Sequence, residues 1–183
     1  MPNISRWGTT DGMRLARTVG KYLRDRSQYT TQEFIDAAER AALEYPDDWV
    51  IFYSLGDKYM SIGQLARALT ACKRCVELKP NDIRSAYALA TAYNMLTRAD
   101  WASIKPEIEQ FVQLLRPPPE AGPFDPDVSK SEAEELGIVI DTAAAQAMRW
   151  FERALQLGPD RDGYRQIQQD LHVLYQRYPH LRA

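Results

Sequence analysis

The stretch from Trp49 to Asp82 reads WVIFYSLGDKYMSIGQLARALTACKRCVELKPND. Its apolar and small residues recur at helical spacing on both sides of Gly63, and Pro80 closes the second segment. This pattern predicts that the stretch forms one complete helix-turn-helix unit. Its characteristic positions are Leu55, Gly56, Tyr59, Gly63, Ala68 and Pro80. Such a unit cannot bury its apolar face alone, so the chain is expected to be all-α and built of stacked helix pairs.

A weaker copy of the unit precedes it. When the sequence is shifted back by the length of the unit, Pro80 falls on Pro46, and Cys72 and Cys75 fall on the small residues Ala38 and Ala41. Small residues are expected where two helices pack closely. The copy is predicted to hold a helix over 11–27 and a second one that ends near Tyr45. The second helix starts at a capping box formed by Thr30 and Glu33. Residues 11–46 are interpreted as a degenerate first repeat.

A third copy is interrupted. Leu89, Ala90 and Tyr93 match the first helix of the unit, and the match resumes at Ala147, Phe151, Ala154 and Pro159. This predicts a split repeat over 83–96 and 141–159, with residues 97–140 inserted between its helices. Residues 97–141 hold ten acidic and four basic residues, a net charge of 4 − 10 = −6. Within them we expect an amphipathic helix over 104–115, a proline-rich linker and a capping box formed by Ser131 and Glu134. From this cap a helix can run unbroken to Leu157, with Gly137 as a weak point.

The remaining C-terminal segment, residues 160–178, lacks the repeat pattern. It carries one apolar stripe at helical spacing: Tyr164, Ile167, Leu171, Leu174, Tyr175 and Tyr178. A helix of this kind is expected to cap the last repeat, because an open end would expose the core.

These residues resemble the tetratricopeptide repeat family, most closely over 49–82. The resemblance implies antiparallel helix pairs stacked in a right-handed superhelix, whose first helices line a concave groove. It also implies scaffolding or peptide binding without catalysis. Members that bind a terminal carboxylate use lysine and asparagine in the first repeat, where this chain has Tyr53 and Asp57. Asp57 would repel such a carboxylate, although Arg84 keeps one positive group within reach.

The repeat register places a set of side chains on the first helices, where a partner is expected to bind. Two tyrosines and one arginine offer the contact area and directional hydrogen bonds that are frequent at interaction hot spots. The alternative is that these side chains contact other parts of the chain and leave no open groove. The candidate residues are Tyr53, Asp57, Met60, Arg84, Tyr87, Thr91 and Asn94, with Val50 beside them.

A second candidate site is basic. Arg14, Arg17, Lys21 and Arg24 would form one stripe of a helix over 11–27 and could attract an anionic partner. The alternative is a solvated outer face.

The sequence shows no catalytic constellation, no metal-ligand set and no cofactor motif. Cys72 and Cys75 have the spacing of a redox pair, but they occupy packing positions in the middle of a helix, so core thiols are expected. The net charge of −2 gives no general attraction to nucleic acid, and no stretch is long and apolar enough for a membrane span. The N-terminus has no apolar segment typical of a secretory signal, and a cytoplasmic location is expected.

Three functions remain in view. The first is a non-catalytic scaffold that binds a protein or peptide through the concave groove or the insertion, with possible self-association. The second is a small chaperone for a secreted or assembling protein. The third is an electrostatic binder that uses the basic first helix.

Overall fold

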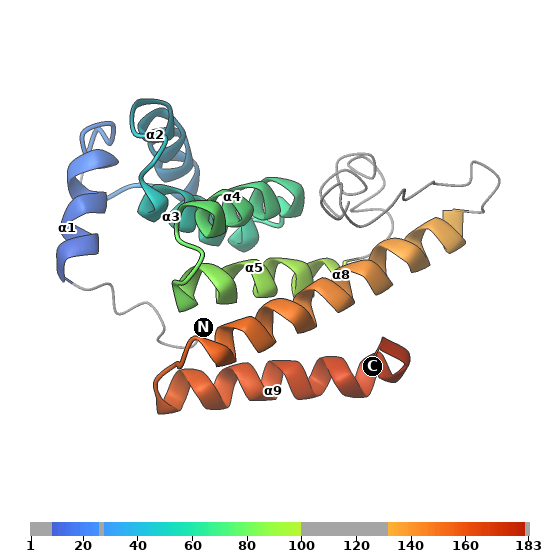
Figure 1. The fold of residues 1–183 in the computed structure, drawn as a ribbon. Helices are drawn as coiled ribbons and strands as arrows, with labels where there is room; N and C mark the ends of the chain where they lie inside the picture. Colours follow the sequence, from blue (N-terminus) through green and yellow to red (C-terminus); the bar gives the residue numbers. More distant parts are fainter. Residues whose placement is uncertain (1–8, 26–27, 100–131, 182–183) are drawn as a thin grey trace.

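A computed structural model of the chain describes residues 9–25, 28–99 and 132–181. Every regular element in these ranges is helical, which confirms the all-α prediction (Figure 1). The helices are α1 Thr9–Thr18, α2 Thr31–Glu44, α3 Trp49–Ser61, α4 Leu65–Leu78, α5 Ile83–Leu96, α8 Glu132–Gln156, α9 Arg161–Arg177 and the short 3-10 helix η4 Pro179–Leu181. None of the helices described has the length and apolar character needed to pass through a membrane.

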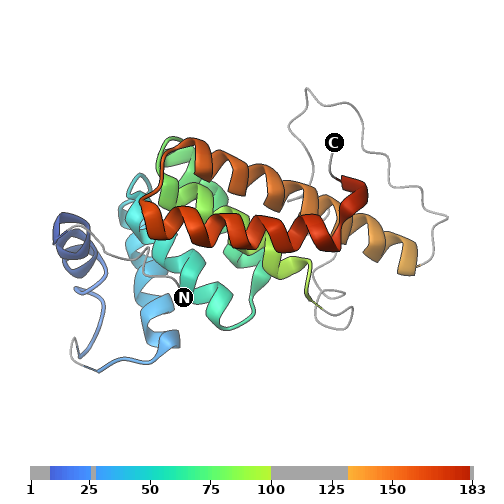
Figure 2. The same cartoon turned by 90° about the horizontal axis from the view of Figure 1, so that it is seen from below.

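Successive helices pack on one another through most of the chain. α2 packs on α3, α3 on α4, α4 on α5, α5 on α8, and α8 on α9 (Figures 1 and 2). α5 also contacts α3, and α3 contacts α1. α9 reaches α5 at two points, where Tyr87 bonds Asp170 and where the Tyr178 hydroxyl lies 3.4 Å from the Thr97 carbonyl oxygen. Consequently α3, α5 and α9 follow one another on the same side of the molecule.

The helix starts follow local chemistry that is visible in the sequence. Thr30 and Glu33 form the predicted capping box at the start of α2. α3 and α5 each begin after an aspartate, Asp48 and Asp82, whose carboxylate accepts the backbone N–H two residues later. Asp48 and Asp82 are separated by the length of one repeat unit. The two helices therefore begin in the same way at the same point of the repeat.

Glycines with a positive φ angle follow the ends of α3 and α8. Gly63 has φ 75° in the turn between α3 and α4, and Gly158 has φ 73° after α8. Only glycine adopts this left-handed region without steric cost. α8 runs through Gly137 without a break, as the sequence predicts. The insertion boundary drawn at Ile140 thus lies inside one continuous helix.

The core is continuous from α2 to α9 and is rich in alanine. Gly56 of α3 faces Cys72 of α4 so closely that a Cβ atom on Gly56 would lie 2.6 Å from the Cys72 Sγ atom. Tyr93 of α5 and Phe151 of α8 belong to the same core and are 3% and 0% exposed. Segments on either side of the predicted insertion thus share one core, and α5 and α8 pack along each other.

The predicted first helix over 11–27 is wrong in its length. α1 ends at Thr18, whose hydroxyl donates to the Arg14 carbonyl oxygen at 3.0 Å. The chain then folds back tightly at Gly20, where a Cβ atom would lie 2.1 Å from the Ala16 carbonyl oxygen. The side-chain hydroxyl and the glycine both favour leaving the helix at this point.

The predictions for the C-terminal helix and for the insertion differ in outcome. The C-terminal helix is present as α9, but Tyr164 in its predicted apolar stripe is 43% exposed. The buried stripe of this helix runs through the preceding residue, Gly163, to Ile167, Leu171 and Leu174, so Tyr164 lies at its edge. The expected helix over 104–115, the proline-rich linker and the Ser131 cap lie outside the described residues.

Candidate functional site

Residues predicted to line the groove on α3 divide into two kinds. Val50 and Met60 are buried at 0% and 8% exposure, so they belong to the core instead of an open surface. Both side chains belong to apolar clusters of the structure. Their helix, α3, is contacted by both α1 and α5. Tyr53 and Asp57 are half-buried. Burial and the nearby Asp57 carboxylate raise the pKa of Tyr53, so its hydroxyl keeps its proton.

Arg84 is held by the protein itself. Its guanidinium lies 3.0 Å from the Asp11 carboxylate of α1 and 3.0 Å from the Asp82 carboxylate, and it stacks over Trp49 at 4.5 Å from the ring centroid. Burial lowers the pKa of Arg84, but its bonds to Asp82 and Asp11 outweigh this and raise it. Three of the N–H groups of Arg84 thus already donate to carboxylates of its own chain, so it is less available to a partner's carboxylate than the sequence suggests.

This ion-paired cluster gives a prediction about pH. Burial raises the pKa of Asp82, but hydrogen bonds and charge from Arg84 outweigh it and lower the pKa overall. A lowered folded-state pKa stabilises the fold above the ordinary aspartate value of about 4, and this stabilisation is lost as pH falls through the folded value. We expect the difference in the free energy of unfolding between wild type and Asp82→Asn to shrink as pH falls from about 5 through the lowered folded-state pKa of Asp82. Urea unfolding of both chains across this range measures it, and a constant difference would contradict the assignment.

Tyr87 lies where α5, α8 and α9 meet. Its hydroxyl donates to Asp170 Oδ2 at 3.1 Å, and its ring packs on Phe151 with centroids 5.7 Å apart. Gln166 also points its amide nitrogen at the Asp170 carboxylate, 3.3 Å from both oxygens. α9 thus adds polar residues next to Tyr87, although the sequence predicts only a capping role for this helix. In the sequence, the position of the acidic residue Asp170 next to the apolar residues Ile167 and Leu171 indicates a polar group at the edge of the buried stripe.

Two buried acceptors on α5 have no partner. Asn94 is 8% exposed, and its Oδ1 atom finds no hydrogen-bond partner among the described residues; the same holds for the Thr91 hydroxyl. Burial raises the pKa of Tyr87, and the nearby Thr91 hydroxyl lowers it by a smaller amount. The two hydroxyls nevertheless form no hydrogen bond of standard geometry. A buried acceptor without a donor costs roughly 1–3 kcal/mol. Arg84, Tyr87, Thr91 and Asn94 fall at i, i+3, i+7 and i+10, so the unpaired acceptors share one stripe with the residues predicted to contact a partner.

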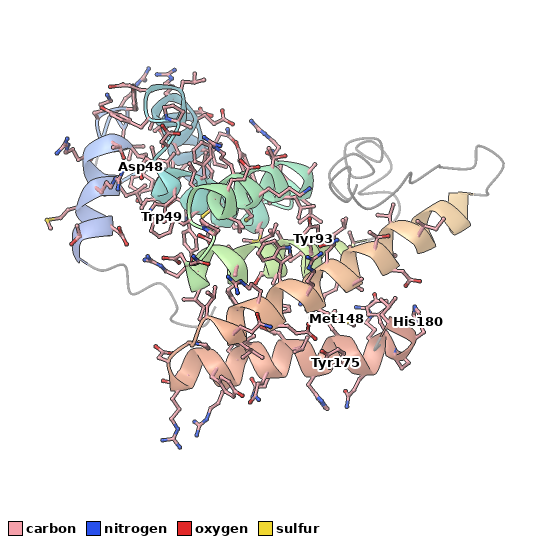
Figure 3. The ribbon with its side chains drawn as sticks, viewed as in Figure 1. Asp48, Trp49, Tyr93, Met148, Tyr175 and His180 are labelled. Atoms are coloured by element: carbon pink, nitrogen blue, oxygen red, sulfur yellow. The ribbon has the colours of Figure 1, made fainter. Side chains whose placement is uncertain are left out.

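We name the set Tyr53, Asp57, Tyr87, Thr91, Asn94, Gln166 and Asp170 the inner face. Tyr53 packs on Trp49 at 6.2 Å between ring centroids, so the face joins the Arg84 cluster at one end. Figure 3 shows Trp49 at the start of α3, next to the start of α5. Three neighbouring helices contribute to the inner face, and it combines aromatic rings with hydrogen-bond acceptors.

The basic residues predicted to form one stripe are not on one helix. Arg14 and Arg17 belong to α1, whereas Lys21 and Arg24 follow its end. Arg14 donates to the buried Asp48 carboxylate at 2.8 Å. Lys21 pairs with Glu44, which also accepts from the Tyr22 hydroxyl. At least two of the four cations thus hold α1 and its following turn against α2 and α3.

A separate hollow of about 760 Å³ lies between α3 and α4, with Pro46 at its edge. Phe52 and Tyr59 line its floor, and Arg67 and Arg74 stand over these rings. Both arginines are paired, Arg67 with Glu39 and Arg74 with Asp47 and Glu77. The charges of both arginines are thus balanced by neighbouring carboxylates, and Lys73 also lines the hollow.

Cys72 and Cys75 are free thiols inside the core. The Cys75 Sγ atom lies 3.1 Å from the Ser85 hydroxyl, and burial raises the pKa of Cys75 to about 11. Burial also raises the pKa of Cys72. The arrangement suits packing, because a reactive thiol needs exposure and a lowered pKa.

Thiol labelling tests this arrangement. At pH 8 we expect both cysteines to react more than ~100-fold slower in the native chain than in urea, because reaction requires a local opening that costs roughly 3 kcal/mol. The measurement follows the absorbance of a chromogenic disulfide reagent. Rapid labelling of one thiol in the native chain would contradict its burial.

No protein-family model matches this chain, and no curated protein has a significantly similar sequence.

Proposed function

We propose that the chain is a tetratricopeptide-like helical repeat protein that holds a protein or peptide partner on the inner face. The observation that carries this proposal is the pair of buried, unpartnered acceptors on α5, on the same stripe as a half-buried tyrosine. A face with aromatic contact area and free acceptors is suited to binding an extended peptide, whose backbone N–H groups are donors.

The repeat assignment is supported by internal geometry. α3 and α5 begin with equivalent aspartate caps one period apart, and α3–α4 and α5–α8 form closely packed pairs. A right-handed superhelix of about two and a half repeats, closed by α9, accommodates these contacts. In this assignment the protein binds without catalysis, and its two buried free thiols suit the reducing cytoplasm.

A capture experiment tests the inner face. Full-length protein carrying Tyr53→Ala is expected to bind its captured partners about 10-fold more weakly than wild type, since buried aromatic contacts at interfaces commonly contribute more than 1 kcal/mol. Tyr29→Ala is the control, because Tyr29 is 48% exposed and packs on Phe34 beside α2. Circular dichroism of both variants checks that they fold. Equal partner recovery from wild type and folded Tyr53→Ala protein would refute the assignment.

A further inference from the structure

The charges on and around the inner face are unbalanced. Four carboxylates lie there or at its margin: Asp11, Asp57, Asp82 and Asp170. Two cations accompany them, Arg84 between Asp11 and Asp82, and Lys58 at 3.7 Å from Asp57. The sum is 2 − 4 = −2. The Lys58 ammonium also lies 5.8 Å from the Phe34 ring centroid, on the α2 side of α3, so it is drawn away from the inner face.

Asp170 is the carboxylate most available to a partner. It accepts only from neutral groups, the Tyr87 hydroxyl and the Gln166 amide. Among the described residues, no lysine or arginine forms an ion pair with it. Asp57 is the second such group, because its contact with Lys58 is long and its side chain is 38% exposed.

These two carboxylates lie on α3 and α9, and both helices reach α5. Asp170 of α9 bonds Tyr87 of α5. Asp57 belongs to α3, which contacts α5. The Thr91 hydroxyl and the Asn94 Oδ1 atom of α5 are buried and unpaired within the described part of the chain, and both can accept a hydrogen bond.

We infer that the partner held on the inner face is a cationic peptide segment, whose lysine or arginine side chains pair with Asp57 and Asp170. This inference rests on the proposed function and names the chemistry of its partner. Cationic side chains satisfy carboxylates through charge-assisted hydrogen bonds, and their stems or guanidinium planes pack on tyrosine rings. The chain's own residues 97–141 carry a net charge of −6, which is not complementary to an acidic face.

Three blocked twelve-residue peptides test the inference against the full-length protein. They share alanine, leucine and glycine positions and carry lysine, glutamine or glutamate at every fourth position. We expect the lysine peptide to bind at least ~10-fold more tightly than the glutamine peptide at low salt, and this advantage should fall as salt rises. The double variant Asp57→Asn/Asp170→Asn should remove the advantage of the lysine peptide over the glutamine peptide. Asp36→Asn, an exposed carboxylate on α2, is the matched control and should change nothing.

The outcomes separate the inference from the proposed function. If the glutamine or glutamate peptide binds as tightly as the lysine peptide, and Tyr53→Ala weakens that binding, the inner face binds peptides but its cationic preference is refuted. If no peptide responds to Tyr53→Ala, the proposed function itself is contradicted. Tight binding of a peptide with the sequence of residues 118–129, or a dimer disrupted by the double variant, would assign the face to the chain itself and overturn the inference.

Discussion

Replacing Phe151 with alanine is expected to lower the free energy of unfolding by about 3–5 kcal/mol. Phe151 is the largest side chain that is fully buried, at 0% exposure, and it lies in the common core of α5 and α8. Truncation removes its apolar contacts and leaves a cavity among helices too closely packed to collapse fully. Its ring also supports Tyr87, so the same change is expected to weaken partner binding.

Urea unfolding followed by circular dichroism measures this effect. Arg149→Ala is the control on the same helix, because Arg149 is exposed and surface changes usually stay within about 0.5 kcal/mol. Equal unfolding midpoints for the wild type and Phe151→Ala would show that α8 does not share a cooperative core with α5.

The second large effect is expected at Gly56. Gly56→Ala should destabilise the fold by a net ~1–2 kcal/mol, although alanine is the better helix former by about 1 kcal/mol. The new methyl group would lie 2.6 Å from the Cys72 Sγ atom, which is itself fully buried. Relief requires either a shift of the thiol within a filled core or separation of α3 from α4, and such overpacking typically costs about 1–3 kcal/mol.

Two further variants isolate the cause. Cys72→Ala removes the sulfur atom that the new methyl group would meet. In a Cys72→Ala background, the loss of unfolding free energy caused by Gly56→Ala should therefore be at least ~1 kcal/mol smaller than in the wild type. Gly137→Ala is the opposite case, because Gly137 is exposed within α8 and a Cβ atom there meets nothing within 4 Å. It should stabilise the protein by roughly 0.5–1 kcal/mol. Additive effects at Gly56 and Cys72 would mean that the contact is not the cause.

Much of the fold was accessible from the sequence, because its signals are local. The Thr30 capping box and the continuous helix through Gly137 depend on neighbouring residues and were predicted correctly. The end of α1 was missed because an apolar stripe continues past Thr18, and only the hydroxyl and Gly20 mark the departure.

The site was less accessible, because its chemistry depends on helices that are distant in sequence. Arg84 looked available until the structure placed Asp11 against it, 73 residues away in the chain. Asp170 was missed for the same reason, since its partner Tyr87 is 83 residues away. Periodicity identifies which side of a helix is apolar, but it does not reveal which charges another helix brings to the polar side.

The length of α8 has a consequence for how the chain can vary. At 25 residues it spans about 37 Å, whereas α5, at 14 residues, spans about 21 Å. Its first turns extend beyond the end of α5, so the chain re-enters the molecule at a distance from where it left (Figure 1). Gly137, near that end, is exposed with open space around it. A change of length between the described ends at Ala99 and Glu132 is therefore expected to disturb the packing of α5 on α8 less than a change in the turn at Gly63 disturbs α3 on α4.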